Sequence, residues 1–534
     1  MYLSSYPFPS RRSPVLSANG IVATSQPLAA QAGLSMLREG GNAVDAALAT
    51  AMALTVLEPT SNGIGSDAFA LIWDGERLHG INASGRWPAA LRAETLRAAG
   101  HASMPALGWN AVSVPGCVAM WADLSERFGK LDPARLLGPA ITHASEGFPL
   151  SPVIATLWKR AQPGFDSGLA PDIAGWTETF TRGGRVPEAG DMWTSPGHAA
   201  CLRGLAARGL RDFYEGEIAA AIVAYAAATG GAICAEDLAA HRSEWVEPIS
   251  ARYGDLDVWE IPPNGQGIAA LQALAMLDAL PSRNLPPLEA QRLHLQIEAM
   301  KLGFADTYAY VADAGVVDVP TAGMLEPGYL ASRRALIGDR ARNPGPGRPP
   351  RGGTVYLCAT DRDGMMVSLI QSNYQGFGSG VVLPELGISF QNRAASFVLD
   401  PEHPNVAAPG KRPRHTIIPG FLTQAGKAVG PFGVMGGEMQ PQGHLQVVAA
   451  MEDHGMNPQA ALDMPRWRWM QGLTVQLEPG ADAALADALR GRGHEVVIAA
   501  DSFGFGRGQI IRRLDSGAYA GGSEPRTDGA AVGY

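Results

Sequence analysis

Apolar residues near the start of the chain recur at the spacing of a helix. Leu28, Leu34 and Leu37 fall on one helical face, with Ser25 placed to cap the helix and Pro27 in its first turn. A glycine pair at 40–41 ends this pattern. Residues 42–57 then form an almost wholly apolar run, which is typical of a helix buried between other layers.

Shorter apolar runs further along predict strands. Ala68–Trp73 and Val112–Val114 are expected to be short buried strands, followed by a mixed helical region up to about Arg340. The last third of the chain is rich in short strands and glycines, and its polar/apolar pattern predicts one helix near Ala481–Arg492.

The sharpest change of character lies at residues 343–353, which read Asn-Pro-Gly-Pro-Gly-Arg-Pro-Pro-Arg-Gly-Gly. A segment with so much proline and glycine and no apolar anchor is expected to be a flexible linker. A hairpin is predicted directly after it, with strands Thr354–Thr360 and Met365–Ser372 joined by a turn at Asp361–Gly364. A strand that begins abruptly after a linker is the feature on which the functional hypothesis depends.

Composition narrows the class of protein. The 534 residues are 46% hydrophobic and 17% charged, as expected of a folded protein with a large core, and the net charge of −9 gives no footprint for nucleic acid. No apolar run is long enough to span a membrane. The four cysteines are isolated and no secretion signal is visible, so a cytoplasmic location is expected. The histidines lack ligand spacing, and neither a metal nor a cofactor is expected.

Thr354 has the surroundings that an N-terminal nucleophile needs. A hydroxyl residue follows the small Gly353, slack lies upstream, and a strand holds it downstream. If the chain is cut before Thr354, the freed α-amine has an intrinsic pKa of roughly 7.7–8.0 and serves as a general base beside the hydroxyl. Gly-Gly-Thr alone is common, and a threonine there usually has only a structural role.

The wider pattern resembles the γ-glutamyltransferase family nearly from end to end. The motifs that carry the resemblance, in chain order, are Gly40-Gly-Asn-Ala-Val-Asp-Ala46, Gly63-Ile-Gly65, Val114-Pro-Gly116, Phe213-Tyr-Glu-Gly216, Glu236-Asp-Leu238, Pro262-Pro263 with Gly265 and Gly267, Glu298-Ala-Met-Lys301, Thr354, Lys411-Arg-Pro413, Gly436-Gly437 and Glu524-Pro-Arg-Thr-Asp528. Each motif is weak alone, but their order is specific.

The resemblance implies an α+β fold, the four-layer αββα sandwich of the Ntn hydrolases. It also implies autocleavage between Gly353 and Thr354 into a large chain, 1–353, and a small catalytic chain, 354–534. The two chains are expected to stay together as one intertwined globular unit, with its further assembly into homo-oligomers left open. By family register, Gly436 and Gly437 would supply the oxyanion donors and Ser372 would hydrogen bond the nucleophile.

The expected substrate pocket departs from that of the γ-glutamyltransferases. Their arginine that grips the substrate α-carboxylate is displaced here to Arg86, and their acidic residue for the α-amine falls near Ser396. Their Ser-Ser pair becomes His415-Thr416. The remaining groups are cationic or neutral, with Arg393 as a second arginine. An arginine fork suits a carboxylate, so Arg86, Arg393, His415 and Thr416 are the predicted substrate-binding residues.

The resulting hypothesis is a threonine amidohydrolase acting on a small amide that bears a carboxylate but no α-amine. The pocket motifs are similar to a bacterial branch that includes oxamate amidohydrolase, which makes oxamate, giving oxalate and ammonia, the preferred substrate. Three alternatives stay open: a γ-glutamyl hydrolase or transpeptidase of the glutathione type, a cephalosporin-acylase-like enzyme, and an unprocessed homologue that only binds.

Overall fold

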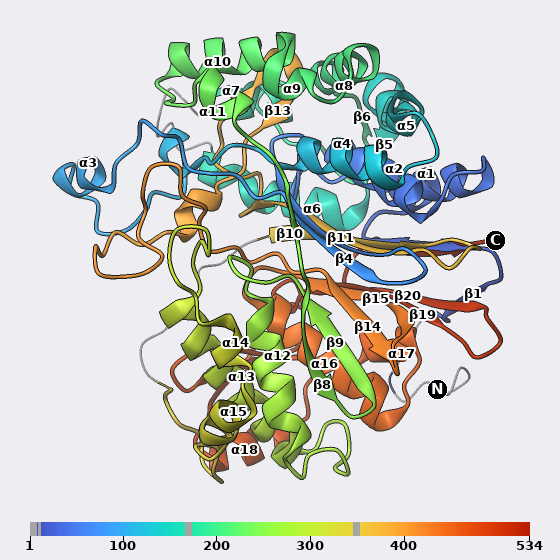
Figure 1. Cartoon of the computed structure of the whole chain (residues 1–534), viewed down its shortest axis with the longest axis vertical. Coiled ribbons are helices and arrows are strands. Elements are labelled where there is room, and N and C mark those ends of the chain that lie inside the picture. Colours follow the sequence, from blue (N-terminus) through green and yellow to red (C-terminus); the bar gives the residue numbers. More distant parts are fainter. Residues whose placement is uncertain (1–7, 9–11, 166–173, 345–352) are drawn as a thin grey trace.

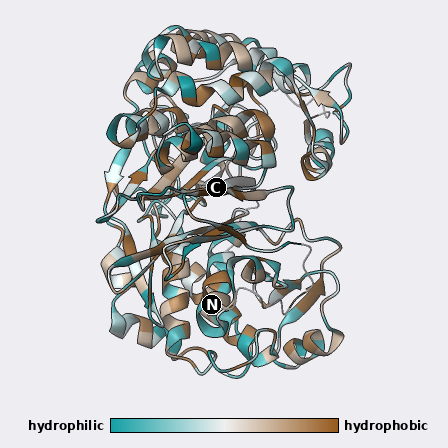
Figure 2. Cartoon of the chain, turned by 90° about the vertical axis from the view of Figure 1, so that its right-hand side faces the viewer, coloured by the Kyte–Doolittle hydropathy of each residue, from teal (hydrophilic) through white to brown (hydrophobic). Residues whose placement is uncertain are grey.

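Two seven-stranded antiparallel sheets lie face to face at the centre of the molecule and are covered by helices on both outer sides (Figure 1). The computed structural model describes residue 8 and residues 12–165, 174–344 and 353–534, with the backbone alone described for 353–355. The order helices, sheet, sheet, helices is also visible after a 90° turn (Figure 2). The chain therefore has the predicted αββα architecture.

Each sheet combines strands from before and after Gly353. The first sheet has the order β21 (Ala530–Gly533), β2 (Ile21–Thr24), β10 (Gly353–Thr360), β11 (Met366–Tyr374), β3 (Asp67–Trp73), β4 (Leu78–Asn82) and β7 (Glu244–Val246). The second has the order β1 (Val15–Ser17), β20 (Tyr519–Ser523), β19 (Arg507–Arg513), β15 (Lys427–Met435), β14 (Gly420–Gln424), β9 (Leu256–Glu260) and β8 (Ile249–Tyr253). The two sheets stack closely, because a Cβ on Gly433 would lie 2.5 Å from the ring of Tyr356.

Two groups of helices cover the sheets. Beside the first sheet are α1 (Pro27–Arg38), α2 (Ala43–Leu57), α4 (Cys117–Phe128), α5 (Pro133–Glu146), α6 (Pro152–Phe165), α7 (Ala174–Phe180), α8 (Pro196–Arg208), α9 (Asp212–Glu215), α10 (Glu217–Thr229) and α11 (Ala235–Ala239). Beside the second are α12 (Gly267–Asp278), α13 (Ala290–Tyr310), α14 (Thr321–Met324), α15 (Pro327–Arg334), α16 (Met439–His454), α17 (Pro458–Asp463) and α18 (Ala483–Gly491). Smaller elements are α3 (Ala93–Ala98), the 3₁₀ turns η1 (Trp109–Ala111), η3 (Pro384–Leu386) and η4 (Arg393–Ser396), the strand pairs β5 (Phe148–Pro149) with β6 (Met192–Trp193) and β12 (Val382–Leu383) with β13 (Ile388–Ser389), and a sheet of β16 (Trp467–Gln471), β17 (Thr474–Leu477) and β18 (Glu495–Ile498).

The local predictions hold best where the pattern is strongest. Helix α2 is buried along its whole length and begins with a capping box in which Asn42 and Asp45 bond each other's backbone N–H groups, so the predicted buried helix is confirmed. The hairpin after Gly353 is also confirmed, as β10 and β11. All four cysteines are free thiols. The predicted linker lies mostly outside the described residues.

Three local predictions are wrong. The cap of α1 is Gln26, because the Ser25 hydroxyl donates instead to the buried Glu58 carboxylate at 2.5 Å. Val112–Val114 belongs to no sheet, and the backbone N–H of Val114 bonds only the Arg86 carbonyl at 3.0 Å. The region up to about Arg340, expected to be mixed helical, also contains the hairpin of β8 and β9. Its signal in the sequence is the alternation of apolar and polar residues along Leu256–Glu260, which matches the alternating burial of this strand.

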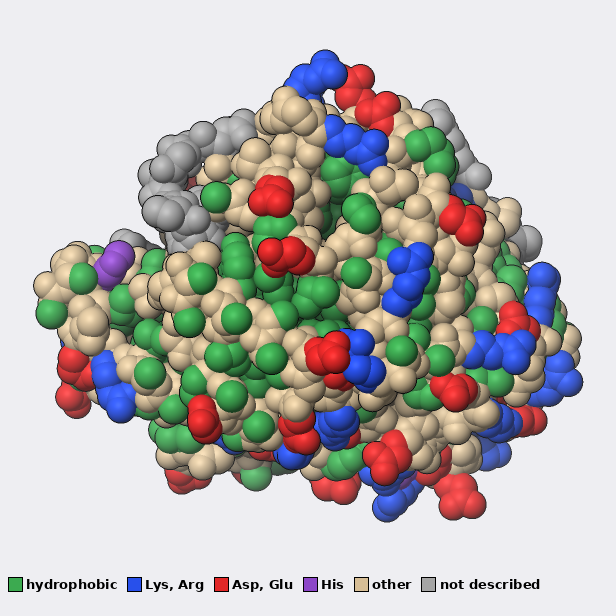
Figure 3. Space-filling view, turned by 90° about the horizontal axis from the view of Figure 1, so that it is seen from above, with side chains coloured by type: hydrophobic (Ala, Val, Ile, Leu, Met, Phe, Trp, Pro, Cys, Tyr) green, Lys and Arg blue, Asp and Glu red, His purple; other side chains and the backbone are tan. Residues whose placement is uncertain are grey.

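The outer surface carries mixed charge. Over the described residues of the face seen from above, acidic and basic side chains are interspersed rather than gathered by sign (Figure 3). Among the described residues, none of the helices combines the length and apolar content that crossing a bilayer requires.

Candidate active site

The site is built around the start of β10, inside the first sheet between β2 and β11. Gly353 pairs with Tyr374 and Val355 pairs with Gln371, with a register shift between these pairs that places Thr354 at a β-bulge. Bulges bend a strand and re-aim its residues, which suits the end of a strand where cleavage of the backbone is expected. The side chain of Thr354 lies outside the described atoms.

Ser372 lies across from this bulge in β11. It is fully buried, its Oγ accepts the backbone N–H of Tyr374 at 2.8 Å, and it pairs with Asp67 of β3. Tyr374 follows with φ of +75°, a left-handed conformation that is uncommon for a non-glycine residue. The bond from its N–H to Ser372 helps to hold this turn. The predicted Ser372 is therefore beside the start of β10.

Arg393 is the group in the site with the clearest unused binding capacity. It begins the 3₁₀ turn η4, is completely buried, and stacks its guanidinium over the Tyr374 ring at 4.0 Å. Its Nη1 donates to Thr416 Oγ1 at 2.8 Å, whereas Nε and Nη2 meet no hydrogen-bond acceptor among the described residues. Burial lowers the pKa of Arg393 to about 10. A buried cation with two open donors needs an anionic partner.

Arg86 is placed differently from Arg393. Its side chain is 41% exposed, and its guanidinium is paired with Asp313 at 3.2 Å and Glu244 at 3.3 Å. Its Nη1 also donates to the Gly410 carbonyl at 3.0 Å. Arg86 is thus held in ion pairs with Asp313 and Glu244, whereas two donors of Arg393 have no partner among the described residues.

His415 faces a carboxyl group of the protein. It is fully buried, with Nε2 3.0 Å from Asp67 Oδ2 and Nδ1 accepting the Ile417 N–H at 3.3 Å, an arrangement that assigns the ring proton to Nε2. Burial, together with Arg393 and Arg414, holds the pKa of His415 well below its usual range. Burial raises the pKa of Asp67 to about 7, against the lowering effect of Arg393. His415 is therefore a neutral positioning group, and its neighbour Thr416 receives the Arg393 bond.

The glycine pair lies between β15 and α16. Gly436 and Gly437 have φ of +131° and +61°. The Gly436 carbonyl accepts the Met439 N–H at 3.0 Å, and the Gly437 carbonyl accepts Gln266 Nε2 at 3.0 Å. The N–H and C=O of a trans peptide point in opposite directions. The N–H groups of Gly437 and Glu438 therefore point away from Met439 and Gln266, which bind the two carbonyls. An oxyanion site needs backbone N–H donors of this kind, and the oxyanion role of the glycine pair stays a prediction.

Gln266 connects the two halves of the site. Its Nε2 donates to the carbonyls of Gly437 and of Thr416, at 3.0 and 2.8 Å. Thr416 in turn accepts from Arg393. A continuous set of contacts therefore runs from the glycine pair to the guanidinium above Tyr374, the residue that pairs with Gly353.

A buried ion pair fixes the residue after the glycines. Glu438 lies 3.3 Å from Arg414 Nη2 and accepts a hydrogen bond from the Tyr308 hydroxyl at 3.2 Å, while Arg414 stacks over the Tyr308 ring at 4.8 Å.

Sequence reasoning missed Gln266, Glu438, Arg414, Asp67 and Tyr374 as members of the site. Arg414 and Glu438 directly follow motifs that it did identify, so their position was the available signal.

One buried cluster among the described residues has the composition of a metal site. The ligand atoms of His294, Glu298 and His494 lie within 4.8 Å of one another. The two histidines are already bonded to each other at 2.8 Å, and Glu298 accepts from Lys301 at 2.6 Å. The His294 and Glu298 side chains also bond the backbone of residues 338 and 342. These contacts give the cluster a structural role, that of anchoring residues 338–342 to α13.

Comparison with known proteins finds relatives that match nearly the whole chain. The family model described as gamma-glutamyltranspeptidase matches residues 29–534. The chain is 36% identical to the oxamate amidohydrolase proenzyme of Klebsiella pneumoniae and 34% identical to the glutathione hydrolase-like YwrD proenzyme of Bacillus subtilis, in each case over 97% of this chain and 99% of the relative. A crystal structure of cephalosporin acylase from Bacillus halodurans is 51% identical and superposes with a TM-score of 0.95, covering 99% of this chain and 98% of that one.

Proposed function

This chain belongs to the γ-glutamyltranspeptidase family of amide-cleaving Ntn hydrolases, and we propose that its substrates are monoamides of dicarboxylic acids without an α-amine. As in its proenzyme relatives, the precursor is cleaved into a large and a small chain. Oxamate, the monoamide of oxalate, is the smallest member of the proposed substrate class.

The observation that carries the proposal is the buried Arg393, whose Nε and Nη2 have no hydrogen-bond partner among the described residues. A planar guanidinium binds a carboxylate through two parallel hydrogen bonds, and burial strengthens such bonds. Its connection through Thr416 and Gln266 to the glycine pair supports an anchor close to the acyl carbonyl.

An α-ammonium group of a substrate would need a carboxylate partner. Among the described residues near Arg393, the carboxylates of the site already have protein partners. Asp67 is bonded to His415, and Glu438 is held by Arg414 and Tyr308. The Ser396 hydroxyl, at the position where the γ-glutamyltransferases are expected to carry their acid, donates to the Arg414 carbonyl at 2.6 Å. A γ-glutamyl group would therefore bring an ammonium without a partner, which disfavours glutathione as the substrate.

The proposed reaction has two halves. The Thr354 hydroxyl attacks the amide carbonyl carbon, the α-amine takes the hydroxyl proton, and N–H donors at Gly436–Glu438 stabilise the oxyanion. The C–N bond breaks as the α-ammonium protonates the departing nitrogen, leaving an ester on Thr354. Water then attacks this ester, gives its proton to the α-amine, and releases the diacid while the proton returns to the threonine oxygen.

The test begins with intact-mass analysis, which is expected to find a new N-terminus at Thr354. Steady-state assays then compare glutaryl anilide with γ-L-glutamyl anilide, which differ only by the α-amine, with release of ammonia from oxamate measured in parallel. A higher kcat/KM for the glutaryl compound is expected. Preference for the γ-glutamyl compound would overturn the proposal in favour of a glutathione-type enzyme, and an uncut, inactive chain would support a binding homologue.

A further inference from the structure

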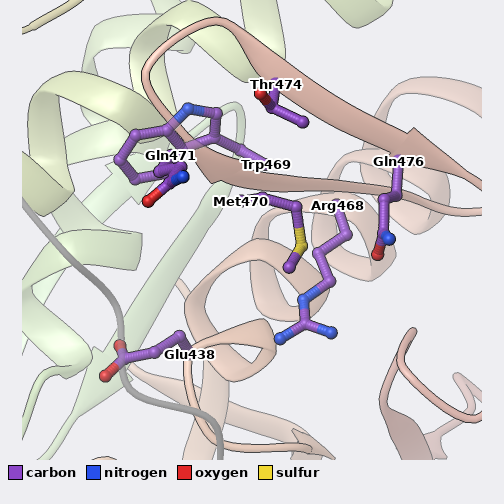
Figure 4. Close-up of a pocket in the computed structure, with 7 residues that line it drawn as sticks. All are labelled: Glu438, Arg468, Trp469, Met470, Gln471, Thr474 and Gln476. Carbon is purple, nitrogen blue, oxygen red and sulfur yellow. The ribbon is translucent and has the colours of Figure 1, made fainter. Parts of the chain in front are cut away.

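A polar pocket begins next to the glycine pair, and Glu438 is the one residue of its lining that also belongs to the site described above (Figure 4). It encloses about 330 Å³, in the range of small-ligand sites. Its lining residues are Glu438, Arg468, Trp469, Met470, Gln471, Thr474 and Gln476. Six of the seven come from the β16–β17 hairpin, whose antiparallel pairing makes one rigid wall.

Glu438 ties this pocket to the reaction centre. It directly follows Gly437, and consecutive Cα atoms are about 3.8 Å apart, so the pocket opens within one residue of the oxyanion donors. A loop outside this lining also lies close to Arg468. A Cβ on Gly504 would lie 2.9 Å from Arg468 Nη1, and a Cβ on Gly436 would lie 3.1 Å from the Gly506 Cα. The loop at 504–506 therefore packs against both the Arg468 guanidinium and the glycine pair.

The charge of the pocket is set by Arg468. Glu438 is the other charged residue that lines it, and its carboxylate is bound by Arg414 and Tyr308. Arg468 and Met470 project from β16 on the side where Glu438 lies (Figure 4). Guanidinium has five N–H donors in a fixed fork, enough to keep a contact within the protein and also hold a carboxylate.

The rest of the lining suits a small organic body. Gln471, Thr474 and Gln476 supply amide and hydroxyl groups, while Trp469 and Met470 supply apolar surface. Trp469 is held in place, because its Nε1 donates to the Gly472 carbonyl at 3.0 Å and its ring packs against Phe304. A pre-formed pocket with one arginine, two amides, a hydroxyl and an apolar wall suits an amino-acid-like molecule.

We propose that this pocket binds the leaving amine, and that the amine carries a carboxylate that Arg468 recognises. The inference rests on the proposed function, because it assigns the acyl carboxylate to Arg393 and the amine carboxylate to Arg468. When the C–N bond breaks, the nitrogen receives its proton from the Thr354 α-ammonium and the amine departs from this pocket. The preferred substrates are then N-(carboxyacyl) derivatives of amino-acid-like amines. Oxamate, which releases ammonia, leaves the pocket unused.

The kinetic test uses two substrates that differ only in the leaving group, N-glutaryl-4-aminobenzoate and N-glutaryl aniline. The wild-type enzyme is expected to prefer the aminobenzoate. Arg468→Gln is expected to lower kcat/KM for the aminobenzoate about tenfold and to leave the aniline within about twofold, because a half-buried charged hydrogen bond is lost only with the anionic amine. Arg490→Gln, a change at an exposed arginine on α18, is the matched control and is expected to change neither.

A binding experiment separates this inference from the proposed function. Calorimetry of the processed enzyme with 4-aminobenzoate needs no turnover and is expected to detect binding to wild type that Arg468→Gln weakens about tenfold. Hydrolysis of the glutaryl compounds without any binding of 4-aminobenzoate overturns the pocket assignment and leaves the proposed function standing. Binding sensitive to Arg468, without hydrolysis, supports the pocket and overturns the proposed function. Equal loss on both substrates in Arg468→Gln also overturns the assignment, because the arginine is then only structural.

Discussion

The guanidinium carbon of Arg393 lies 4.0 Å from the centre of the Tyr374 ring, and Tyr374 pairs through its backbone with Gly353 in the neighbouring strand. This relationship fixes a buried cation beside the bond that is expected to be cut. It also orients the guanidinium, because the ring covers one of its faces and Thr416 takes Nη1. The edge that carries Nε and Nη2 has no hydrogen-bond partner among the described residues and is where the proposed substrate carboxylate would bind.

Replacing Thr354 by alanine removes the hydroxyl that begins both processing and catalysis. The variant is expected to stay as one full-length chain and to lose hydrolysis, because no other group is both nucleophile and N-terminal base. Intact-mass measurement checks the first outcome and an anilide assay the second. Thr354→Ser, which keeps a hydroxyl, is the control and is expected to be cut. Cleavage of Thr354→Ala at the same bond would falsify the nucleophile assignment.

Arg393→Lys keeps the positive charge but loses the planar fork. Charged hydrogen bonds contribute about 1.5–3 kcal/mol, so kcat/KM for glutaryl anilide is expected to fall roughly 10- to 150-fold. Butyryl anilide, which has no carboxylate, is the control substrate, and its slower hydrolysis is expected to change little. An equal loss on both substrates would mean that Arg393 supports the fold of the site rather than the carboxylate.

Gly436→Ala tests the oxyanion donors. The residue has φ of +131°, and its new Cβ would lie 3.1 Å from the Gly506 Cα, so the peptide must shift and its donors move with it. Loss of one such donor lowers kcat by about 10²–10³. Gly480→Ala is the matched control, since Gly480 also has positive φ, +81°, but its Cβ would meet no atom within 4 Å. That variant is expected to lose some stability and keep its kcat.

Asp67→Asn tests the buried acid beside His415. Burial raises the folded-state pKa of Asp67 to about 7, above its unfolded value, so the folded protein holds a proton that the unfolded chain releases between about pH 4 and 7. The contribution of Asp67 to the free energy of unfolding is therefore present at low pH and is lost as the pH rises through about 7. The total change in the free energy of unfolding is up to roughly 4 kcal/mol.

Asparagine mimics the neutral acid at every pH. The difference in unfolding free energy between Asp67→Asn and wild type is therefore expected to move in favour of the variant as pH rises from 5 to 8. Denaturant titrations at several pH values measure this difference. A difference that stays constant with pH would show that Asp67 is ionised throughout the range.

Glu524→Gln tests the structural role of the C-terminal motif. Glu524 is fully buried, and its carboxylate lies 2.8 Å from Arg466 and 2.6 Å from Arg526. Removing this charge leaves the buried Arg466 without its ion-pair partner, and breaking a buried pair destabilises a protein by about 3–5 kcal/mol. The midpoint of denaturant unfolding is expected to fall, whereas Glu402→Gln, at an exposed position, is expected to leave it unchanged. An unshifted midpoint for Glu524→Gln would contradict this role.

The sequence by itself determined the features that depend on near neighbours. The buried helix α2 follows from an unbroken apolar run and the Asn42–Asp45 capping box, and the hairpin of β10 and β11 follows from its polar turn after residues 343–353. The position of Thr354 at the head of a strand is of the same kind, because it requires only Gly353 before it and an apolar run after it.

Tertiary structure alone decided which polar groups meet. Arg86 and Arg393 are equivalent in sequence as carboxylate ligands, yet packing pairs the first with Asp313 and Glu244 and leaves two donors of the second open. Gln266 and Gly437 are 171 residues apart and form a hydrogen bond only because α12 and β15 belong to layers that pack together. Such contacts depend on how sheets stack and chains cross over, and no short window of residues encodes that geometry.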